Sequence, residues 1–303
     1  MKNHIDSIFQ EIKEDRITGA VELVKKGADA TVLFISNFTG TPPIFFNELI
    51  RISKLLIDSQ PSMAPFFHLA NILLLSTEDI QDLEKMKRAT KKAIRTFVFH
   101  LQSGIEQISK IARGLIPEGS KVLTHSYSST VLRTLTDAKQ EGRQFEVICT
   151  ESRPICEGTQ LAKKLFDAHI KVQLQIDSAA PYTMKGVHLV LVGADCLAPL
   201  GLVNKVGTYG LALSARERKV PFYALCGTEK LLGSGMANKF RILKRDPKEV
   251  WPHSPDGMEV LNFYFDTTPL DYLSATVTEE GLLSQNEIHQ RFQKMKVSKY
   301  FPK

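Results

Sequence analysis

The sequence predicts an α/β protein with an N-terminal helical domain and a C-terminal domain built on a doubly wound parallel sheet. Through the first 120 residues, apolar side chains recur at helical spacing and strand signals are few. Beyond them, short apolar runs alternate with helix-like segments, as in the βαβ units of a Rossmann-like domain. The 303 residues, 43% hydrophobic and 24% charged, have the composition of an ordinary folded protein and are enough for two domains.

One long amphipathic helix is predicted between the two domains. Apolar residues recur from Leu83 at spacings of three, four or their sums, Thr90 interrupts them, and Pro117 ends the helix. At ~1.5 Å per residue such a helix is about 50 Å long, which exceeds the width of a small domain. We therefore expect it to bridge a helical domain of residues 1–116 and a sheet domain of residues 117–303. The apolar positions are Met86, Ile94, Phe97, Leu101, Ile105, Ile108, Ala112 and Leu115.

Five strands are predicted in the second domain, each from a short apolar run. No G-x-G-x-x-G turn follows the first of them, and the sequence contains no G-x-x-x-x-G-K-[ST] loop. These absences disfavour nicotinamide-dependent enzymes and P-loop NTPases. The predicted strands are Lys121–Leu123, Phe145–Cys149, Val172–Ile176, Leu189–Val192 and Pro221–Cys226.

Polar residues follow four successive strands of this predicted sheet. In a parallel α/β sheet, ligands bind outside the carboxyl ends of the strands, so we expect these ends to form a crevice. Taken singly, Ser126 or Asp177 would be better explained as the cap of a helix N-terminus than as a catalytic residue. Together the four ends favour a binding site. They are the segments 124–128, 150–154, 177–180 and 193–195.

The segment from Val192 to Thr208 predicts a small-anion site. Its apolar strand ends at Asp195, which places that carboxylate where chemistry takes place in such sheets. A helix is predicted to begin with Asn204 and Lys205, and a helix N-terminus attracts anions. Lys205 is therefore the residue expected to hold a phosphate.

The net charge of the chain does not identify its partners. A net charge of +6 suits acidic partners, from metabolite phosphates to nucleic acid, without choosing between them. A cluster of lysines and arginines between Lys85 and Arg95 lies on the long helix, but no aromatic residues alternate with them. We expect a solvated face there and no direct nucleic-acid binding.

Cysteine usage and the absence of long apolar stretches indicate a cytoplasmic protein without membrane contact. The four cysteines form no C-x-x-C pair, as expected of reduced thiols. No run approaches the roughly 20 apolar residues that span a bilayer, and no signal-like leader opens the chain. The eight histidines and four cysteines show no metal-ligand spacing, so neither a metal nor another cofactor is expected.

The motifs at the predicted strand ends resemble a known superfamily. It comprises the alpha, beta and delta subunits of eukaryotic initiation factor 2B, methylthioribose-1-phosphate isomerase and ribose-1,5-bisphosphate isomerase. The resemblance covers residues 90 to 290, and the order of the motifs is specific. The motifs are E-S-R-P at 151–154 followed by Glu157-Gly158, D-S-A-A at 177–180, G-A-D at 193–195 and N-K-V-G-T at 204–208.

This resemblance implies a set of phosphate-binding residues. Residues 16–20, R-I-T-G-A, look like the R-G-A turn of the family, where an arginine and backbone amides hold phosphate. Helix packing is the alternative role of its Gly-Ala pair. The run F-D-T-T-P at 265–269 resembles a family segment that lies near the active site and the dimer partner. The implied ligand-binding residues are Arg16, Gly19, Ala20, Arg153, Glu157, Asn204 and Lys205.

The catalytic pair of the family isomerases is only half present. They carry a cysteine after Thr-His that exchanges a proton with the aspartate of G-A-D; here Asp195 is kept and Ser126 replaces the cysteine. A serine hydroxyl is a far weaker acid than a thiol with a pKa of about 8.5, so without an adjacent base it cannot do the same work. Tyr127 also stands where the isomerases carry asparagine, which makes this turn more similar to the alpha subunit.

Three functions follow from the resemblance and stay open at this point. The favoured one is an alpha-subunit-like regulatory or assembly protein that binds a sugar phosphate or nucleotide and is related to guanine-nucleotide exchange on initiation factor 2. The second is an aldose–ketose isomerase of a 1-phosphorylated pentose, with Asp195 and Ser126 as its catalytic positions. The third is a scaffold with a vestigial pocket. The expected partners are the ligand, a second copy in a homodimer or larger assembly, and other initiation factor 2B-type subunits.

Overall fold

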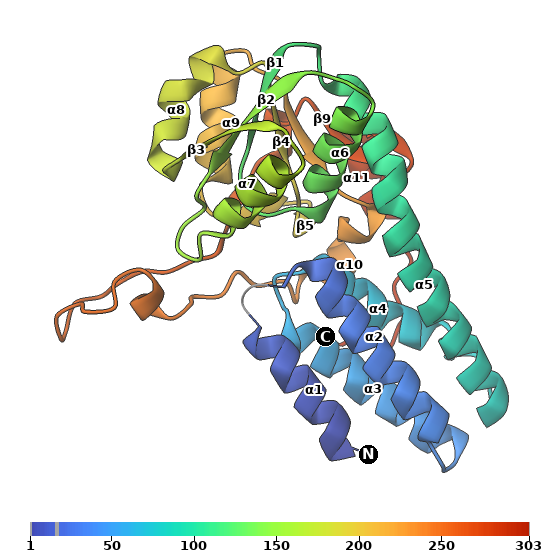
Figure 1. Ribbon diagram of the computed structural model, residues 1–303. Coiled ribbons are helices and arrows are strands. Elements are labelled where there is room, and N and C mark those ends of the chain that lie inside the picture. Colours follow the sequence, from blue (N-terminus) through green and yellow to red (C-terminus); the bar gives the residue numbers. More distant parts are fainter. Residues whose placement is uncertain (1, 16–17, 303) are drawn as a thin grey trace.

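A computed structural model describes residues 2–15 and 18–302. Four helices form the N-terminal part, a long fifth helix runs from them along the sheet domain, and most later elements gather around the sheet (Figure 1). This arrangement confirms the predicted order of a helical region followed by a mostly parallel sheet. The N-terminal helices are α1 (Lys2–Glu14), α2 (Ala20–Asn37), α3 (Pro42–Ser59) and α4 (Ala64–Leu75).

The long helix α5 (Leu83–Ala112) connects the two parts, as the spacing of its apolar residues predicts. Asp82 caps it by accepting a hydrogen bond of 2.7 Å from the backbone N–H of Lys85. Its first two thirds bury Phe97 and Leu101 in the core of the N-terminal helices. Its last third buries Ile108 and Ala112 in a core of the sheet domain. One helix therefore belongs to two hydrophobic cores.

The central sheet has seven strands in the order β10-β9-β7-β4-β1-β2-β3. All neighbours in it pair in parallel except β9 and β10, which are antiparallel. The five predicted strands are all present, within a residue or two of their predicted bounds, and β9 and β10 are additions. The strands are β1 (Ser120–Thr124), β2 (Phe145–Thr150), β3 (Lys171–Gln175), β4 (Leu189–Val192), β7 (Phe222–Leu225), β9 (Ala275–Thr278) and β10 (Gly281–Leu283).

Helices cover both faces of the sheet, as the term doubly wound implies. One core packs α6, α7 and the end of α5 against residues such as Val122 of β1. The other packs α9 and α11 against the residue that follows, Leu123, because successive strand residues point to opposite faces. The helices are α6 (Ser129–Gln140), α7 (Glu157–Asp167), α9 (Thr208–Glu217) and α11 (Gln285–Lys294).

A second, three-stranded antiparallel sheet corrects one expectation. It consists of β5 (Cys196–Ala198), β6 (Gly201–Lys205) and β8 (Phe265–Thr268), so Asn204 and Lys205 end a strand and do not begin a helix. The helix starts later, with α9 at Thr208. The cause is the tight turn between β5 and β6, where Gly201 has a φ of +138° and lies so close to β8 that a Cβ would come within 2.4 Å of the Thr268 carbonyl oxygen.

The end of the chain returns to the N-terminal helices. Asn71 of α4 donates a hydrogen bond of 2.9 Å to the Lys296 carbonyl and accepts one of 2.9 Å from the backbone N–H of Ser298. Phe301 and the β5–β6 hairpin complete the core of those helices. The predicted boundary at residue 116 therefore stays a prediction. None of the described helices has the length and apolar composition of a membrane-spanning segment.

Candidate functional site

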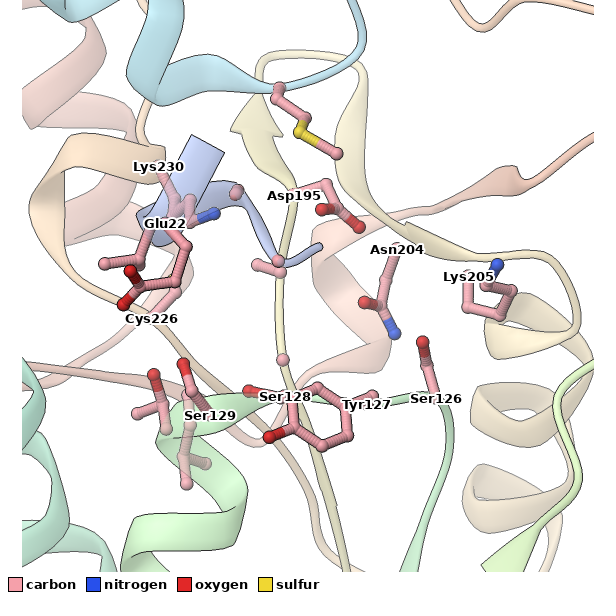
Figure 2. Close-up of a pocket in the computed structure, with 18 of the residues that line it drawn as sticks. Glu22, Ser126, Tyr127, Ser128, Ser129, Asp195, Asn204, Lys205, Cys226 and Lys230 are labelled. Atoms are coloured by element: carbon pink, nitrogen blue, oxygen red, sulfur yellow. The ribbon is translucent and has the colours of Figure 1, made fainter. Parts of the chain in front are cut away.

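The carboxyl ends of the strands open onto a cavity of about 440 Å³ that the N-terminal helices close from the other side. Because β4, β1, β2 and β3 are neighbours in the sheet, their polar ends share one edge, as expected. Figure 2 shows Ser126, Asp195, Asn204 and Lys205 around this cavity. The sequence-predicted residues that line it are Gly19, Ala20, Ser126, Glu157, Asp195, Asn204 and Lys205.

Two of the predicted phosphate-binding residues are not among those that line the cavity. Arg16 lies outside the described residues. The Arg153 guanidinium donates a hydrogen bond of 3.1 Å to the Val250 carbonyl, which belongs to the loop that extends from the sheet domain. Asp177 accepts hydrogen bonds from the backbone N–H groups of Ser152 and Arg153, at 2.7 and 2.8 Å, and so holds the turn after β2. This placement gives no support to Arg153 as a ligand-binding residue.

Ser126 occupies a strained turn after β1. Its φ is +70°, a conformation that non-glycine residues rarely adopt outside functional or tightly held turns. Its backbone N–H donates to Ser152 Oγ at 2.7 Å, and its hydroxyl donates to Glu157 Oε1 at 2.7 Å. The helix cap at this turn is Ser128, whose Oγ accepts from the Val131 N–H at 3.3 Å. Ser126 is therefore free of the capping role and faces the cavity.

Glu157 joins Ser126 to Lys205. Its Oε1 atom, which accepts from the serine, also lies 2.8 Å from Lys205 Nζ. The Lys205 side chain is only 7% exposed and the Glu157 side chain only 11%. The lysine ammonium stands 4.7 Å from the ring centroid of Tyr264, and the Arg245 guanidinium stands 5.0 Å from the same ring. Two cations thus meet at one aromatic ring, an arrangement that favours a bound anion.

Asp195 lies at the junction of the two parts of the molecule. Its carbonyl accepts a hydrogen bond of 3.0 Å from the N–H of Ala64, the first residue of α4, and its N–H donates to the Val203 carbonyl at 2.9 Å. Desolvation raises the pKa of its carboxyl above the usual value, while the charges of Lys230 and Lys205 oppose that shift. The carboxyl is therefore more readily protonated than an exposed aspartate.

His125 is neutral, and both of its ring nitrogens are hydrogen-bonded to residues other than Ser126. Its Nε2 lies 2.9 Å from the Val206 carbonyl, which can only accept, so this nitrogen carries the proton. Its Nδ1 accepts from Thr150 Oγ1 at 2.6 Å. Burial lowers the pKa of the imidazole, which keeps the ring uncharged. His125 thus positions the segment that leads into α9 and does not activate the Ser126 hydroxyl.

Sequence reasoning missed the residues that follow the fifth strand, β7. Lys230 is only 6% exposed and its ammonium faces the cavity beside Glu22 and Cys226 (Figure 2). Burial raises the pKa of the Cys226 thiol, so this sulfur stays protonated and unreactive. The search for polar residues at the ends of the first four predicted strands would have found Lys230 if it had included the fifth.

Among the described residues, no cluster of three or more His, Cys, Asp or Glu side chains could hold a metal ion.

Comparisons with known proteins identify the family of the chain. The model of the initiation factor 2 subunit family matches residues 12–285. A translation initiation factor eIF-2B subunit 2-like protein of Pyrococcus furiosus is 33% identical over 91% of this chain and 95% of its own length. A ribose 1,5-bisphosphate isomerase of Archaeoglobus fulgidus is 31% identical over 90% and 88%. The crystal structure of Pyrococcus horikoshii eIF-2B superposes with a TM-score of 0.81 at 29% identity, covering 94% of this chain and 98% of that one. The chain therefore belongs to the initiation factor 2 subunit family.

Proposed function

We propose that the protein binds a small phosphorylated sugar or nucleotide and acts through that binding, as a regulatory or assembly subunit of the initiation factor 2B type. The observation that carries the proposal is the pair of cations, Lys205 and Arg245, held on Tyr264 at the edge of the cavity. Beside them, Asn204 offers an amide to the ligand. A volume of about 440 Å³ lies in the range of small-molecule sites. The four cysteines are free, which supports a cytoplasmic location.

The arrangement around Ser126 argues for binding without turnover. Its hydroxyl donates a hydrogen bond to Glu157 Oε1, and this same oxygen is already ion-paired with Lys205. The one histidine nearby, His125, is turned toward Thr150 and Val206. The Cys226 thiol at the cavity wall is held protonated by burial, which raises its pKa. A serine without an activating base contributes little to proton transfer near neutral pH.

One observation favours the second candidate, an aldose–ketose isomerase. Desolvation raises the pKa of Asp195, and a carboxyl group tuned in this way can serve as a general acid near neutral pH. A relative named ribose 1,5-bisphosphate isomerase is 31% identical over 90% of this chain. An isomerase would need a second proton-transfer group that replaces the missing thiol.

Calorimetric titration tests the binding proposal. With ribose 5-phosphate as the probe, Lys205→Ala and Arg245→Ala should each weaken binding by about 1.5–3 kcal/mol, the contribution of a charge-assisted hydrogen bond. Lys163→Ala is the matched control, because that lysine is 76% exposed on α7 and pairs with Asp167. If one of these two variants fails to fold, the other still tests the proposal. Wild-type affinity in both would contradict the proposal.

A turnover assay separates the two candidates. We expect no conversion of ribose 1,5-bisphosphate or methylthioribose 1-phosphate above a small fraction of the ~10 per second of an ordinary enzyme. Ser126→Cys adds the missing thiol and should at most restore traces of activity. Robust wild-type turnover that Asp195→Asn abolishes would overturn the regulatory proposal and establish the isomerase.

A further inference from the structure

The outer face of the first part of α5 carries a line of cations. Between Lys85 and Arg95, every exposed residue is a lysine or an arginine. Successive members of this line are three or four residues apart, so their side chains lie one above another along the helix. Figure 1 shows this part of α5 at the edge of the molecule. We call these residues the basic stripe: Lys85, Arg88, Lys92 and Arg95.

The basic stripe has no acidic partner among the described residues. None of its four side chains makes an ion pair or a hydrogen bond with another described side chain. The neighbouring Lys87, by contrast, is only 14% exposed and pairs with Glu84 at 3.0 Å. No aspartate or glutamate occurs in the sequence from Lys85 to Ile105. The stripe is therefore a surface of uncompensated positive charge, which attracts polyanions.

Phe99 extends the stripe with an exposed aromatic ring. It follows Arg95 by four residues and so lies on the same face of the helix, where it is 64% exposed. The opposite face buries Ile94 and Phe97 in the core, to which Phe99 does not belong. The sequence predicts a solvated face because no aromatic residue alternates with the cations. The structure places one at the end of their line.

The form of this surface suits a nucleic acid strand. At ~1.5 Å per residue, Phe99 lies about 21 Å along the helix from Lys85, and the cations between them form a straight row. Such a row can follow the phosphates of a nucleic acid backbone. An exposed aromatic ring offers its face to a base that is not paired, and this stacking tolerates any base. Cations and ring together therefore match both parts of a single strand.

An acidic protein is a less suitable partner for the stripe. Exposed ion pairs between protein side chains contribute little to affinity. A partner helix would also need an apolar seam to pack against, and α5 exposes no apolar side chain before Phe99. On a nucleic acid, each lysine or arginine instead releases condensed counterions, which favours binding without close packing.

We propose that the basic stripe and Phe99 form a binding site for single-stranded nucleic acid. The four cations contact phosphates of the strand, and Phe99 stacks on an unpaired base. A duplex keeps its bases stacked inside, so Phe99 contributes nothing to duplex binding. The site uses none of the residues that line the cavity at the strand ends. It goes beyond the proposed function and does not depend on it.

Fluorescence anisotropy with a labelled oligouridine of about twelve nucleotides tests the proposal. Four phosphate contacts predict a loss of affinity of about 50-fold between 50 and 200 mM salt, which is a slope of about −3 in the logarithmic plot. Arg88→Gln combined with Lys92→Gln should weaken binding at least about tenfold at 50 mM salt and halve this slope. Phe99→Ala should weaken binding about tenfold, leave the slope unchanged and have no effect on an RNA duplex.

Lys54→Gln combined with Lys163→Gln is the matched control. It removes two charges from exposed lysines of α3 and α7, so affinity should stay within about twofold of wild type. An oligothymidylate of the same length is the second probe, and the tighter strand identifies RNA or DNA as the source of the ligand. Wild-type affinity in both stripe variants would overturn the proposal. Polyglutamate that binds as tightly as oligouridine and displaces it would also overturn it, in favour of an acidic protein.

Discussion

A single carboxylate oxygen organises the most enclosed part of the site. Glu157 Oε1 accepts from the Ser126 hydroxyl and lies 2.8 Å from the Lys205 ammonium, which keeps further N–H donors for a ligand. Taking charged groups out of water is costly unless they are paired, and this pair is almost fully enclosed. The shared oxygen holds the Lys205 ammonium beside the ring of Tyr264 before any ligand arrives.

Glu229 should make the stability of the protein depend on pH. Burial raises the pKa of its carboxyl from 4.5 to about 7. Between these values the unfolded chain has lost the proton that the folded chain keeps, so the free energy of unfolding falls as pH rises through this window. Glu229→Gln removes this penalty. It should raise the free energy of unfolding by about 1–3 kcal/mol at pH 8 and by much less at pH 4.5.

Urea denaturation of wild type and variant at the two pH values measures this difference. Glu217→Gln, which changes an exposed carboxylate at the end of α9, is the control and should show no such pH dependence. An equal effect of Glu229→Gln at both pH values would show that the carboxyl is not desolvated.

At the scale of elements, the turn between β1 and α6 depends on close contact with the end of β4. A Cβ added to Gly193 would come within 2.7 Å of Ser128 Cβ, and Ser128 caps α6 directly after the turn that holds Ser126. Gly193→Ala must therefore push this turn outward. We expect a loss of about 1–3 kcal/mol of stability, as for other overpacked sites, together with weaker binding of ribose 5-phosphate.

Gly210→Ala provides the comparison. A Cβ there meets no atom within 4 Å and lies inside α9, where alanine is the better helix former. Chemical denaturation should find this variant as stable as wild type or slightly more so. Should Gly193→Ala behave in the same way, the contact between β4 and α6 would not matter for the site.

The sequence predicted the long helix and the five parallel strands well because each depends on a local pattern of apolar residues. It failed at Asn204 and Lys205, where the tight turn at Gly201 and pairing with the distant strand β8 override the expected helix. Asp195 and Ser126 were found because strand ends are marked in the sequence. Glu22 could not be found in this way, since an acid in a first helical turn ordinarily serves the helix alone.

At the scale of the whole molecule, a loop extends well away from the sheet domain between α10 (Ser234–Ala237) and β8 (Figure 1). It carries exposed apolar side chains, with Trp251 exposed to 46%, Met258 to 53% and Leu261 to 56%. Such side chains on a protruding loop are typical of a surface that contacts another chain. The F-D-T-T-P run at 265–269, which resembles a family segment near the dimer partner, follows this loop.

We expect the protein to form a dimer that buries more than about 2,000 Å², as obligate dimers do. Sedimentation velocity at micromolar concentration should find no monomer. Leu261→Lys places a charge on the loop and should weaken the dimer, whereas Leu33→Lys, at a residue 48% exposed on α2, should leave it unchanged. A wild-type protein that sediments as a monomer would contradict the expectation.

The double membership of α5 limits how a ligand can reach the cavity. The helix carries Leu101, Gly104, Ile105 and Ile108 on the cavity wall while its two halves are anchored in separate cores. The helix contains no proline, but the pair Ser103-Gly104 lies between its two anchored parts, and helices bend at such pairs. A hinge motion that separates the helical domain from the sheet domain would remove a straight α5 from one of its two cores. Any movement that opens the cavity must therefore bend α5 near Gly104, which is itself on the cavity wall, or be confined to the loops at the rim.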